Sequence, residues 1–378
     1  MLVMQLARWG YDVAEAASGY QALDLASQSH FDILLSDWFM PGMTGPDLCR
    51  AFRALPRETY GYFILISAKS GKSAVTDGLS SGADDFLTKP VDPAELQARL
   101  HAGERILQMQ AELRRRNQDL ERLYGALQRD LAEARRLQLS LIPPHVVHLR
   151  HGEAVFLMQP SGHLGGDLVG WFPLAENRVA LYAIDVSGHG VASALMATRL
   201  AALLSGRSRD QNIAFLDGRP LRAEQVVDRL NRLLCADQQG DLYLTMIYAD
   251  ISLTDGMAHI VQAGHPYPQH LTHGCGPVRI GRGGFPVGLT TEATYNAIQL
   301  SLSPGDRLVI PSDGITECPG PSGDLGDRGL AALIRDQSRL RGDALRRALL
   351  AALSDHAGTQ DFPDDISAIV FDYHGCPS

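Results

Sequence analysis

The sequence predicts three parts: a doubly wound α/β unit over residues 1–100, a coiled-coil-like helix over 101–142, and an α+β sandwich flanked by helices over 143–374. A chain of 378 residues exceeds what one core usually organises, so more than one unit is expected. Two near-continuous apolar runs in the first part are typical of strands buried on both faces of a parallel sheet. A long stretch without proline ends at Pro143 and Pro144, and short alternating strands follow it. Such alternation favours antiparallel pairing with helices covering the sheets.

The strands of the first part end in polar residues that could act together. FDILLSD (31–37) ends at Asp37, YFILISA (62–68) carries Ser67 near its end, and GADDFLTKP carries Lys89 before a proline. In an open α/β sheet, the carboxyl ends of the strands line the ligand crevice. The sequence therefore predicts that these three side chains meet at one edge of the sheet. The alternative is a turn carboxylate beside a surface lysine.

The stretch Glu95–Ile142 contains Gly103 and Gly125 as its only glycines and no proline, so a long helix is predicted. Its apolar residues recur at steps of seven, some with a second apolar residue three positions later: Ile106, Met109, Leu113, Leu120, Leu123, Leu127, Ala134, Leu137 and Leu141. This pattern predicts a coiled-coil seam and a homodimer. Arg116 and Asp130 occupy seam positions, where polar residues lower stability while fixing the register. The alternative is one amphipathic helix packed on its own domain.

The third part contains short apolar strands with helices between them. The strands include RVALYAIDV (178–186), YLTMIYADI (243–251), MAHIVQAG (257–264), DRLVIPSD (306–313) and ISAIVFDY (366–373). Helices are expected around residues 191–205, 222–235 and 328–354. The third part should therefore be a sandwich with helical flanks.

Aspartates stand at the ends of these strands, often beside glycine. Asp167 follows two glycines, Asp185 lies near the end of an apolar strand, Asp313 precedes a glycine, and Asp364 and Asp365 come directly before the last strand. Carboxylate oxygens suit Mg²⁺ or Mn²⁺, and glycine lets backbone carbonyls approach the ion. Any one Asp-Gly pair is more often a simple turn, but this many strand-end aspartates in one domain indicate a site for hard cations.

The composition argues against several classes of protein. With 34 Lys and Arg against 43 Asp and Glu, the net charge of −9 provides no basic footprint for nucleic acid. No run of about 18 apolar residues and no signal-peptide pattern occur, so we expect neither a membrane span nor export, but a cytoplasmic protein. The 5 cysteines include no C-x-x-C pair, which argues against a zinc knuckle or a disulfide framework.

The polar strand ends of the first part, in this order, resemble the receiver domain of two-component response regulators. The resemblance implies that Asp37 is the phosphoacceptor, that Ser67 senses the phosphoryl group, and that Lys89 is its cationic partner. It further implies that Phe86 is the switch aromatic and that a sensor histidine kinase is the upstream partner.

The start of the chain departs from the receiver pattern. Receivers open on a strand that ends in an acidic pair for Mg²⁺, whereas Leu2, Leu6 and Trp9 recur here at helical spacing. In the family's strand order the absent strand lies inside the sheet, so its loss would expose buried edges. We therefore expect the natural chain to start upstream. If it does not, Mg²⁺-dependent phosphorylation of Asp37 is not expected.

A series of motifs in the third part resembles the metal-dependent PPM-type serine/threonine phosphatases of the SpoIIE-like branch, over residues 143–373. The motifs are GGD ending at Asp167, DVSGHG-x-x-x-A from Asp185 to Ala194, TMIY from Thr245 to Tyr248, AGHP from Ala263 to Pro266, G-x-P-x-G-L from Gly284 to Leu289, SDGITE from Ser312 to Glu317, and DDIS from Asp364 to Ser367. The segment ARRLQLSLIPP (134–144) resembles the switch helix that precedes such domains. The whole chain thus resembles a response regulator with a phosphatase output domain.

The resemblance implies a centre with two Mn²⁺ or Mg²⁺ ions. Asp185 would bridge the ions, with the Val186 carbonyl on one, Asp313 and Asp364 on the other, and Asp167 close by. Two ions that share a carboxylate activate a bridging water for attack on a phosphoester. By the same resemblance, the substrate is a phosphorylated STAS-type anti-sigma-factor antagonist.

Other residues of these motifs are expected to support the centre. His189 and His265 should shape loops rather than bind metal, and Ser312 and Thr245 should be supporting hydroxyls. Gly188 and Gly190 would let the chain turn tightly before the helix that follows.

This sequence departs from the phosphatase family at two places. Leu168, Val169 and Gly170 replace the aromatic residue and aspartate that often follow GGD, and no arginine lies between Met158 and Asp167 to grip a phosphate. The substrate phosphate would then be held mainly by the metals. None of the four core carboxylates is lost, which argues against an inactive relative.

Two other classes of function are alternatives to a metal-dependent phosphatase. A catalytically silent scaffold would keep the fold and bind a regulatory partner under receiver control. A serine hydrolase would use Ser187 and His189, but the nucleophile-elbow spacing G-x-S-x-G is absent there.

Overall fold

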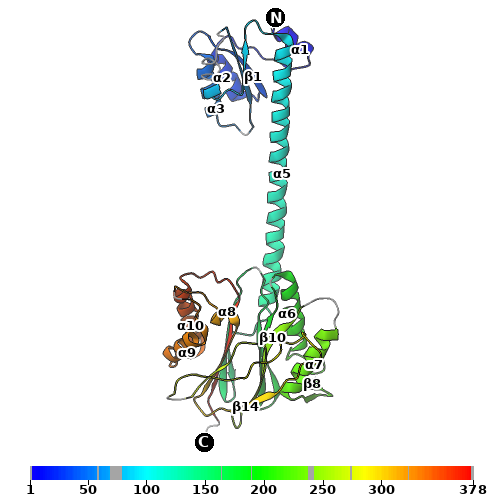
Figure 1. Ribbon diagram of the computed structural model, residues 1–378, viewed down its shortest axis with the longest axis vertical. Helices are drawn as coiled ribbons and strands as arrows, with labels where there is room; N and C mark the ends of the chain where they lie inside the picture. The colour runs from blue at the N-terminus through cyan, green and yellow to red at the C-terminus, as the bar shows by residue number, and fades with distance from the viewer. Residues whose placement is uncertain are drawn as a thin grey trace. The chain divides into compact units, whose positions relative to one another are not determined.

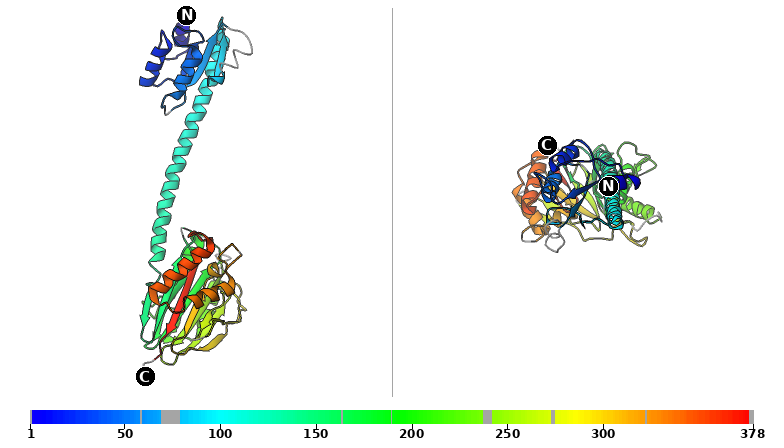
Figure 2. Two further views of the ribbon diagram at one scale, coloured as in Figure 1. Left: turned by 90° about the vertical axis from the view of Figure 1, so that its left-hand side faces the viewer. Right: turned by 90° about the horizontal axis from the view of Figure 1, so that it is seen from above.

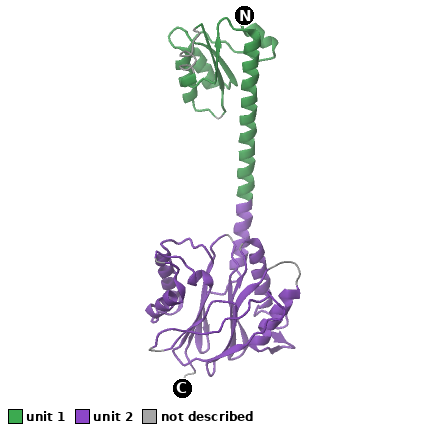
Figure 3. Ribbon diagram, viewed as in Figure 1, with its two compact units in different colours: residues 1–126 green, residues 127–378 purple. Residues whose placement is uncertain are grey.

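The computed structural model describes residues 2–57, 59–68, 79–162, 164–188, 190–236, 242–272, 275–321 and 323–375 (Figure 1 and Figure 2). The chain divides into two compact units, residues 1–126 (unit 1) and 127–378 (unit 2) (Figure 3). One helix, α5 (Pro93–Leu139), contributes residues to both units.

Unit 1 is built on three parallel strands. In spatial order they are β1 (Ile33–Asp37), β2 (Tyr62–Ser67) and β3 (Asp85–Thr88), accompanied by helices α1 (Leu2–Arg8), α2 (Gly19–Gln28) and α3 (Gly45–Ala54). Because side chains alternate along a strand, Phe63 and Leu65 pack against α2 and α3, whereas Ile64 and Ile66 pack against α1 and α5. Helices on both faces confirm the predicted doubly wound arrangement.

Strand β1 forms one edge of this sheet, and β3 forms the other. The chain opens on α1, as its apolar spacing predicts, and residues 11–16 form no strand. Across the described residues, β1 pairs with β2 alone, and Ile33, Leu34 and Leu35 are only half-buried. Every residue of β2, which has a neighbour on each side, is buried. The difference in burial follows from the position of each strand in the sheet.

Helix α5 covers 47 residues and agrees closely with the helix expected over 95–142. Its first turns belong to unit 1, where Leu96 and Leu100 are buried against the sheet. Gly103 is required there, because a Cβ at this position would lie 2.6 Å from Cδ1 of Tyr62. No helix in the described parts of the chain is long and apolar enough to cross a membrane.

Unit 2 contains two antiparallel sheets. The first holds β14 (Ala297–Ser301), β11 (Met257–Ala263), β10 (Leu244–Ser252), β7 (Arg178–Val186) and β6 (Leu168–Ala175) in spatial order. The second holds β13 (Val278–Arg279), β12 (Gln269–Leu271), β15 (Arg307–Pro311), β16 (Ile366–Tyr373), β5 (Gly152–Gln159) and β4 (Val146–Leu149). A short hairpin, β8 (Phe215–Leu216) with β9 (Arg219–Pro220), lies outside both.

The two sheets form a sandwich with helices on both outer faces (Figure 1). In β7, Leu181 and Ala183 face the second sheet, whereas Tyr182 and Ile184 face helices α6 (Val191–Leu203) and α7 (Ala223–Ala236). The outer face of the second sheet packs against α9 (Gly326–Asp336) and α10 (Gly342–Ala357). This layering confirms the predicted α+β sandwich.

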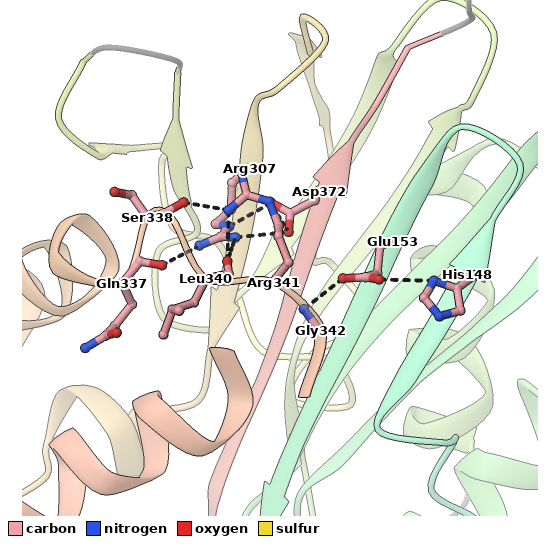
Figure 4. A network of polar contacts seen from close by, with 9 residues as sticks. All are labelled: His148, Glu153, Arg307, Gln337, Ser338, Leu340, Arg341, Gly342 and Asp372. Carbon is pink, nitrogen blue, oxygen red and sulfur yellow. Dashed lines mark hydrogen bonds and ion pairs between the residues drawn. The ribbon is translucent and has the colours of Figure 1, made fainter. Parts of the chain in front are cut away.

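The helical region expected over 328–354 is two helices rather than one. The buried Arg307 guanidinium donates hydrogen bonds to the carbonyls of Gln337 (3.3 Å) and Leu340 (2.7 Å), between α9 and α10 (Figure 4). The same guanidinium donates to both oxygens of Asp372, at 2.7 and 3.0 Å. The chain therefore turns its carbonyls toward a buried charge instead of continuing the helix, and α10 begins at Gly342.

Candidate metal-dependent active site

The aspartates predicted in unit 2 gather at one end of the sandwich. Leu168 pairs with Ile184 across β6 and β7, so Asp167 and Asp185 are neighbours at the end of that pair. Pro311 pairs with Ala368 across β15 and β16, and the chain continues from there into α8 (Asp313–Thr316). Asp364 and Asp365 directly precede β16 on the same side. Antiparallel pairing within each sheet, and the packing of the two sheets on each other, thus bring together carboxylates that lie up to 198 residues apart.

These carboxylates repel one another in a poorly solvated place. Burial, reinforced by the charge of Asp185, raises the pKa of Asp167 well above its usual range. Burial, together with the charges of Asp313 and Asp364, raises the pKa of Asp185 to about 7. Burial and Asp364 also raise the pKa of Asp313. A cation in their midst would remove both penalties, because it supplies the opposite charge and replaces the lost solvation.

The residues present fit a hard cation. Oδ2 of Asp167 is buried and has no hydrogen-bond partner among the described residues, although buried polar atoms are normally satisfied. The Val186 carbonyl lies close to Gly166, where a Cβ would come within 2.8 Å of that oxygen. The donors are all oxygens, which suits Mg²⁺ or Mn²⁺. Among the described residues, no group of three Asp, Glu, His or Cys side chains is arranged closely enough to hold a metal ion as it stands.

Asp365 is a site residue that the sequence prediction left without a role. Its Oδ1 accepts hydrogen bonds from the backbone N–H (2.8 Å) and the hydroxyl (3.1 Å) of Ser161, and its Oδ2 accepts from the backbone N–H of Asp167 (3.4 Å). Asp365 therefore holds the loop that carries Asp167. The second aspartate of DDIS was the available signal, but only the fold shows what it binds.

Two glycines of the motifs are explained by Asp365. A Cβ at Gly165 would lie 2.2 Å from Oδ2 of Asp365, and a Cβ at Gly314 would lie 2.1 Å from its backbone carbonyl oxygen. Neither place has room for a side chain. The GGD motif thus allows one loop to approach the carboxylate of Asp365, and the SDG motif allows another to approach its backbone carbonyl.

Gln138 lies in ARRLQLSLIPP (134–144), the segment that resembles the switch helix, but no role for this residue itself is predicted from the sequence. It stands one residue before the end of α5, is buried, and forms two hydrogen bonds with the backbone of Gly165. In the sequence, Gln138 is one of several glutamines in a polar helix whose residues are mostly exposed. Nothing local distinguishes it from the other glutamines of α5.

The expected supporting hydroxyls, of Thr245 and Ser312, lie next to residues of the carboxylate cluster. Thr245 is directly opposite Asp185 in the pairing of β10 with β7, and its Oγ1 lies 2.8 Å from Nδ1 of His265. Burial lowers the pKa of His265 to about 3, so this imidazole is neutral. The Ser312 hydroxyl donates to the Asp365 carbonyl at 3.3 Å and accepts from the Ser367 N–H at 3.0 Å.

Ser187 is engaged in backbone pairing. Its Oγ accepts a hydrogen bond from the backbone N–H of Tyr243 at 3.1 Å, and its own N–H donates to the Tyr243 carbonyl at 2.9 Å. Gly188 and Gly190 have φ values of 83° and 92°, which favour glycine, as expected for the tight turn. His189 lies outside the described residues.

The predicted polar residues of unit 1 also lie at one end of their sheet. Asp37 ends β1, Ser67 ends β2, and Lys89 directly follows β3 and forms an ion pair with Asp37. Ser67 is fully buried. Phe86 is buried in an edge-on contact with Trp38, with ring centroids 6.1 Å apart.

The fold and the two strand-end sites define a receiver-type α/β unit followed by a PP2C-like sandwich. The family model described as "Stage II sporulation protein E (SpoIIE)" matches residues 175–374, more than half of the chain, and the chain belongs to this family. The model described as "Response regulator receiver domain" matches residues 1–101.

Individual relatives match one part of the chain each. "Phosphoserine phosphatase RsbP" of Bacillus subtilis is 28% identical over 198 residues, which are 50% of this chain and 45% of RsbP. "Response regulator PleD" of Caulobacter vibrioides is 41% identical over 106 residues, which are 28% of this chain and 23% of PleD. This chain therefore spans less than half the length of either relative.

A solved structure shows the fold of the larger part. The "SiaA-PP2C domain of Pseudomonas aeruginosa" superposes with a TM-score of 0.57 at 18% identity, covering 66% of this chain and 98% of that domain. At this identity the likeness concerns the fold alone.

Proposed function

We propose that this chain is a response regulator whose output domain is a metal-dependent protein serine/threonine phosphatase. The observation that carries the proposal is the cluster of carboxylates in unit 2, where burial, together with mutual repulsion, raises the pKa of Asp185 to about 7. Such a cluster of buried carboxylates destabilises the fold, and a bound cation would offset that cost. Family membership and the similarity to RsbP support the same conclusion.

In this proposal Asp185 is the shared ligand of two Mn²⁺ or Mg²⁺ ions. Asp313 and Asp364 would serve one ion, and the Val186 carbonyl the other, with Asp167 close by. The ions would supply an activated water and hold the phosphate of the substrate. The chain itself positions the ligands: Asp365 holds the Asp167 loop, and the Thr245–His265 pair supports the strand end opposite Asp185.

The test is phosphate release from a phosphoserine peptide and from p-nitrophenyl phosphate, with Mn²⁺, Mg²⁺ or a chelator. Release should require the metal and should be lost in Asp185→Asn. A folded protein that binds Mn²⁺ but releases no phosphate from either substrate would favour a silent scaffold instead. Release that persists in excess chelator would favour a metal-independent hydrolase.

We further propose that the protein substrate is a phosphorylated STAS-type anti-sigma-factor antagonist. The support is resemblance to the phosphatase family, together with the similarity to RsbP, which is named a phosphoserine phosphatase. Incubating the chain with a panel of phosphorylated STAS domains and unrelated phosphoproteins would test this choice. Faster dephosphorylation of an unrelated phosphoprotein would reject it.

For unit 1 we propose phosphorylation of Asp37 by a sensor histidine kinase, with Ser67, Lys89 and Phe86 as the responding residues. The ion pair between Lys89 and Asp37 places a cation where the phosphoryl group would arrive. Labelling with a phosphorylated histidine kinase or acetyl phosphate should modify the wild-type protein and spare Asp37→Asn.

We also propose that α5 pairs with α5 of a second copy. Met109, Leu113, Leu120 and Leu123 are each at least 60% exposed, and they follow the predicted seam. Exposed leucines at heptad spacing are stabilised by burial against a partner helix. Light scattering should give a dimer for the wild type and a monomer for a variant with Leu113→Glu and Leu120→Glu.

A further inference from the structure

Tyr243 directly precedes β10 and is bonded to the chain that leaves β7. Its carbonyl accepts a hydrogen bond from the backbone N–H of Ser187 at 2.9 Å, and its own N–H donates to Oγ of Ser187 at 3.1 Å. The two bonds extend by one residue the antiparallel pairing in which Leu244 lies opposite Val186. The sheet therefore fixes the backbone of Tyr243 just beyond the end of the strand.

The position of Tyr243 along the chain places its side chain on the face of the sheet that carries Asp185. Leu244 and Val186 belong to the core between this sheet and helices α6 and α7. Because side chains alternate along a strand, their neighbours Tyr243, Thr245 and Asp185 belong to the opposite face. Thr245 lies directly opposite Asp185, and Tyr243 is two residues away, roughly 7 Å along an extended chain. The ring therefore stands at the outer edge of the carboxylate cluster.

The side chain of Tyr243 is available to a ligand. It is 38% exposed, whereas Tyr182 in β7 and Tyr248 in β10 are buried in the core. Across the described residues, both hydrogen bonds of Tyr243 are made by its backbone. A tyrosine combines an apolar ring with a hydroxyl that can donate and accept, so it gains from burial against a polypeptide.

The proposed ions do not by themselves distinguish a phosphoprotein from a small phosphate ester. They would hold the phosphate, which all substrates of this class share. No arginine lies between Met158 and Asp167 to add a second grip on that phosphate. Discrimination between substrates therefore has to come from groups that touch the chain on either side of the phosphoserine.

We propose that Tyr243 is a specificity-determining residue that contacts the polypeptide next to the phosphoserine. Its ring packs on the flanking residues, and its hydroxyl forms a hydrogen bond with their backbone. The inference rests on the proposed phosphatase function and names a substrate contact of that same site. A small phosphate ester lacks this contact and gains nothing from Tyr243.

The test compares a phosphoserine peptide with two small esters, free phosphoserine and p-nitrophenyl phosphate, in full-length Tyr243→Ala and Tyr243→Phe at saturating Mn²⁺. Loss of a well-packed aromatic contact typically weakens binding about 10-fold or more, so Tyr243→Ala should raise KM for the peptide by about that factor. Tyr243→Phe keeps the ring and should raise it by a smaller factor. In both variants, kcat for the peptide and kcat/KM for the small esters should stay within about 2-fold of wild type.

The matched control is Tyr20→Ala, the same substitution at a 62% exposed position of α2 in unit 1. It should change none of these constants. An unchanged KM for the peptide in Tyr243→Ala, or equal losses for the peptide and the small esters, would overturn the inference. Weaker Mn²⁺ binding or a lower melting temperature in both Tyr243 variants would assign this residue a structural role and overturn it as well.

Failure of the proposed phosphatase activity has a different signature. In that case the wild type binds Mn²⁺ but releases no phosphate from any of the three substrates. Calorimetric binding of the phosphoserine peptide to the Mn²⁺-loaded protein then decides the role of Tyr243. Affinity about 10-fold weaker in Tyr243→Ala supports the contact, whereas equal affinity in the two proteins, or no binding to the wild type, overturns it.

Discussion

The two units place aspartates at strand ends in the same way and balance their charge differently. In unit 1, Asp37 is partly exposed and forms an ion pair with Lys89 of the same chain. In unit 2, no Lys or Arg of the described residues forms an ion pair with Asp167, Asp185 or Asp313, and burial raises the pKa of each. Unit 1 supplies its own cation, whereas unit 2 needs one from solution.

This difference shows that the surroundings of a strand-end aspartate decide how its charge is balanced. A single carboxylate at a sheet edge is satisfied by one lysine and keeps an oxygen available for modification. Several carboxylates in a buried space repel one another, and either protonation or a polyvalent ion relieves that repulsion. The same strand-end placement therefore gives a carboxylate paired with lysine in unit 1 and a group of buried, mutually repelling carboxylates in unit 2.

The largest expected effect is on basal phosphatase activity, where a substitution in unit 2 and one in unit 1 should differ most. Asp313→Asn removes a proposed ligand and should lower Mn²⁺-dependent phosphate release by more than about 100-fold, beyond the ~10–100-fold typical of outer-shell changes. Asp37→Asn should leave basal release within about 2-fold, because Asp37 belongs to the other unit. Equal losses in the two variants, measured by steady-state phosphate release, would contradict the division of roles.

The next effect is on stability without metal. A carboxyl with a raised pKa keeps its proton in the folded state after the unfolded chain has lost it. The contribution of Asp185 to stability is therefore fully present below pH ~4, the pKa of an unfolded aspartate, and is lost as pH rises through about 7. Metal-free protein should lose thermal stability between pH 5 and 8, on the order of a few kcal/mol.

The control for this pH dependence is Asp185→Asn, which removes the titrating group. The metal-free variant should unfold at a higher temperature than metal-free wild type at pH 8, and its melting temperature should change less between pH 5 and 8. Scanning calorimetry in a chelating buffer measures both. A variant less stable than wild type at pH 8 would show that the cluster is not under repulsion.

The smallest effect is expected at the ion pair of unit 1. Lys89→Ala should change the free energy of unfolding by less than about 1 kcal/mol, because both partners are partly exposed. Denaturant unfolding of a Trp171→Phe chain, followed by the fluorescence of Trp9 and Trp38 in unit 1, would measure it. A loss several times larger would mean that Lys89 is a structural residue of the fold.

The sequence predicts structure and site residues well where an apolar strand and the aspartate at its end belong to one short motif. The runs that became β2, β7 and β16 were predicted from apolar patterning, and the aspartates at their ends from their neighbours in the chain. The roles of Asp365 and Gln138 depend on contacts with residues 198 and 27 positions away, respectively. Local patterns carry no trace of such contacts.

The break between α9 and α10 was missed for a similar reason. Residues 328–354 are helical in composition, and the turn within them is stabilised by Arg307, which lies in β15. A buried guanidinium that needs backbone carbonyls outweighs local helix propensity over a few residues. The sequence pattern predicts that residues 328–354 are helical, but it does not predict the contact with Arg307 that divides them into two helices.

The central claim is that the carboxylates of unit 2 form a cation site, and titration calorimetry of the full chain with Mn²⁺ tests it most directly. At pH 6.5, in two buffers of different ionisation enthalpy, wild-type protein should bind two ions and release protons, because the raised pKa of Asp185 leaves it largely protonated. Asp185→Asn should lose the proton release and most of the binding. Folded wild-type protein that binds no Mn²⁺, or binding that is unchanged in Asp185→Asn, would contradict the account.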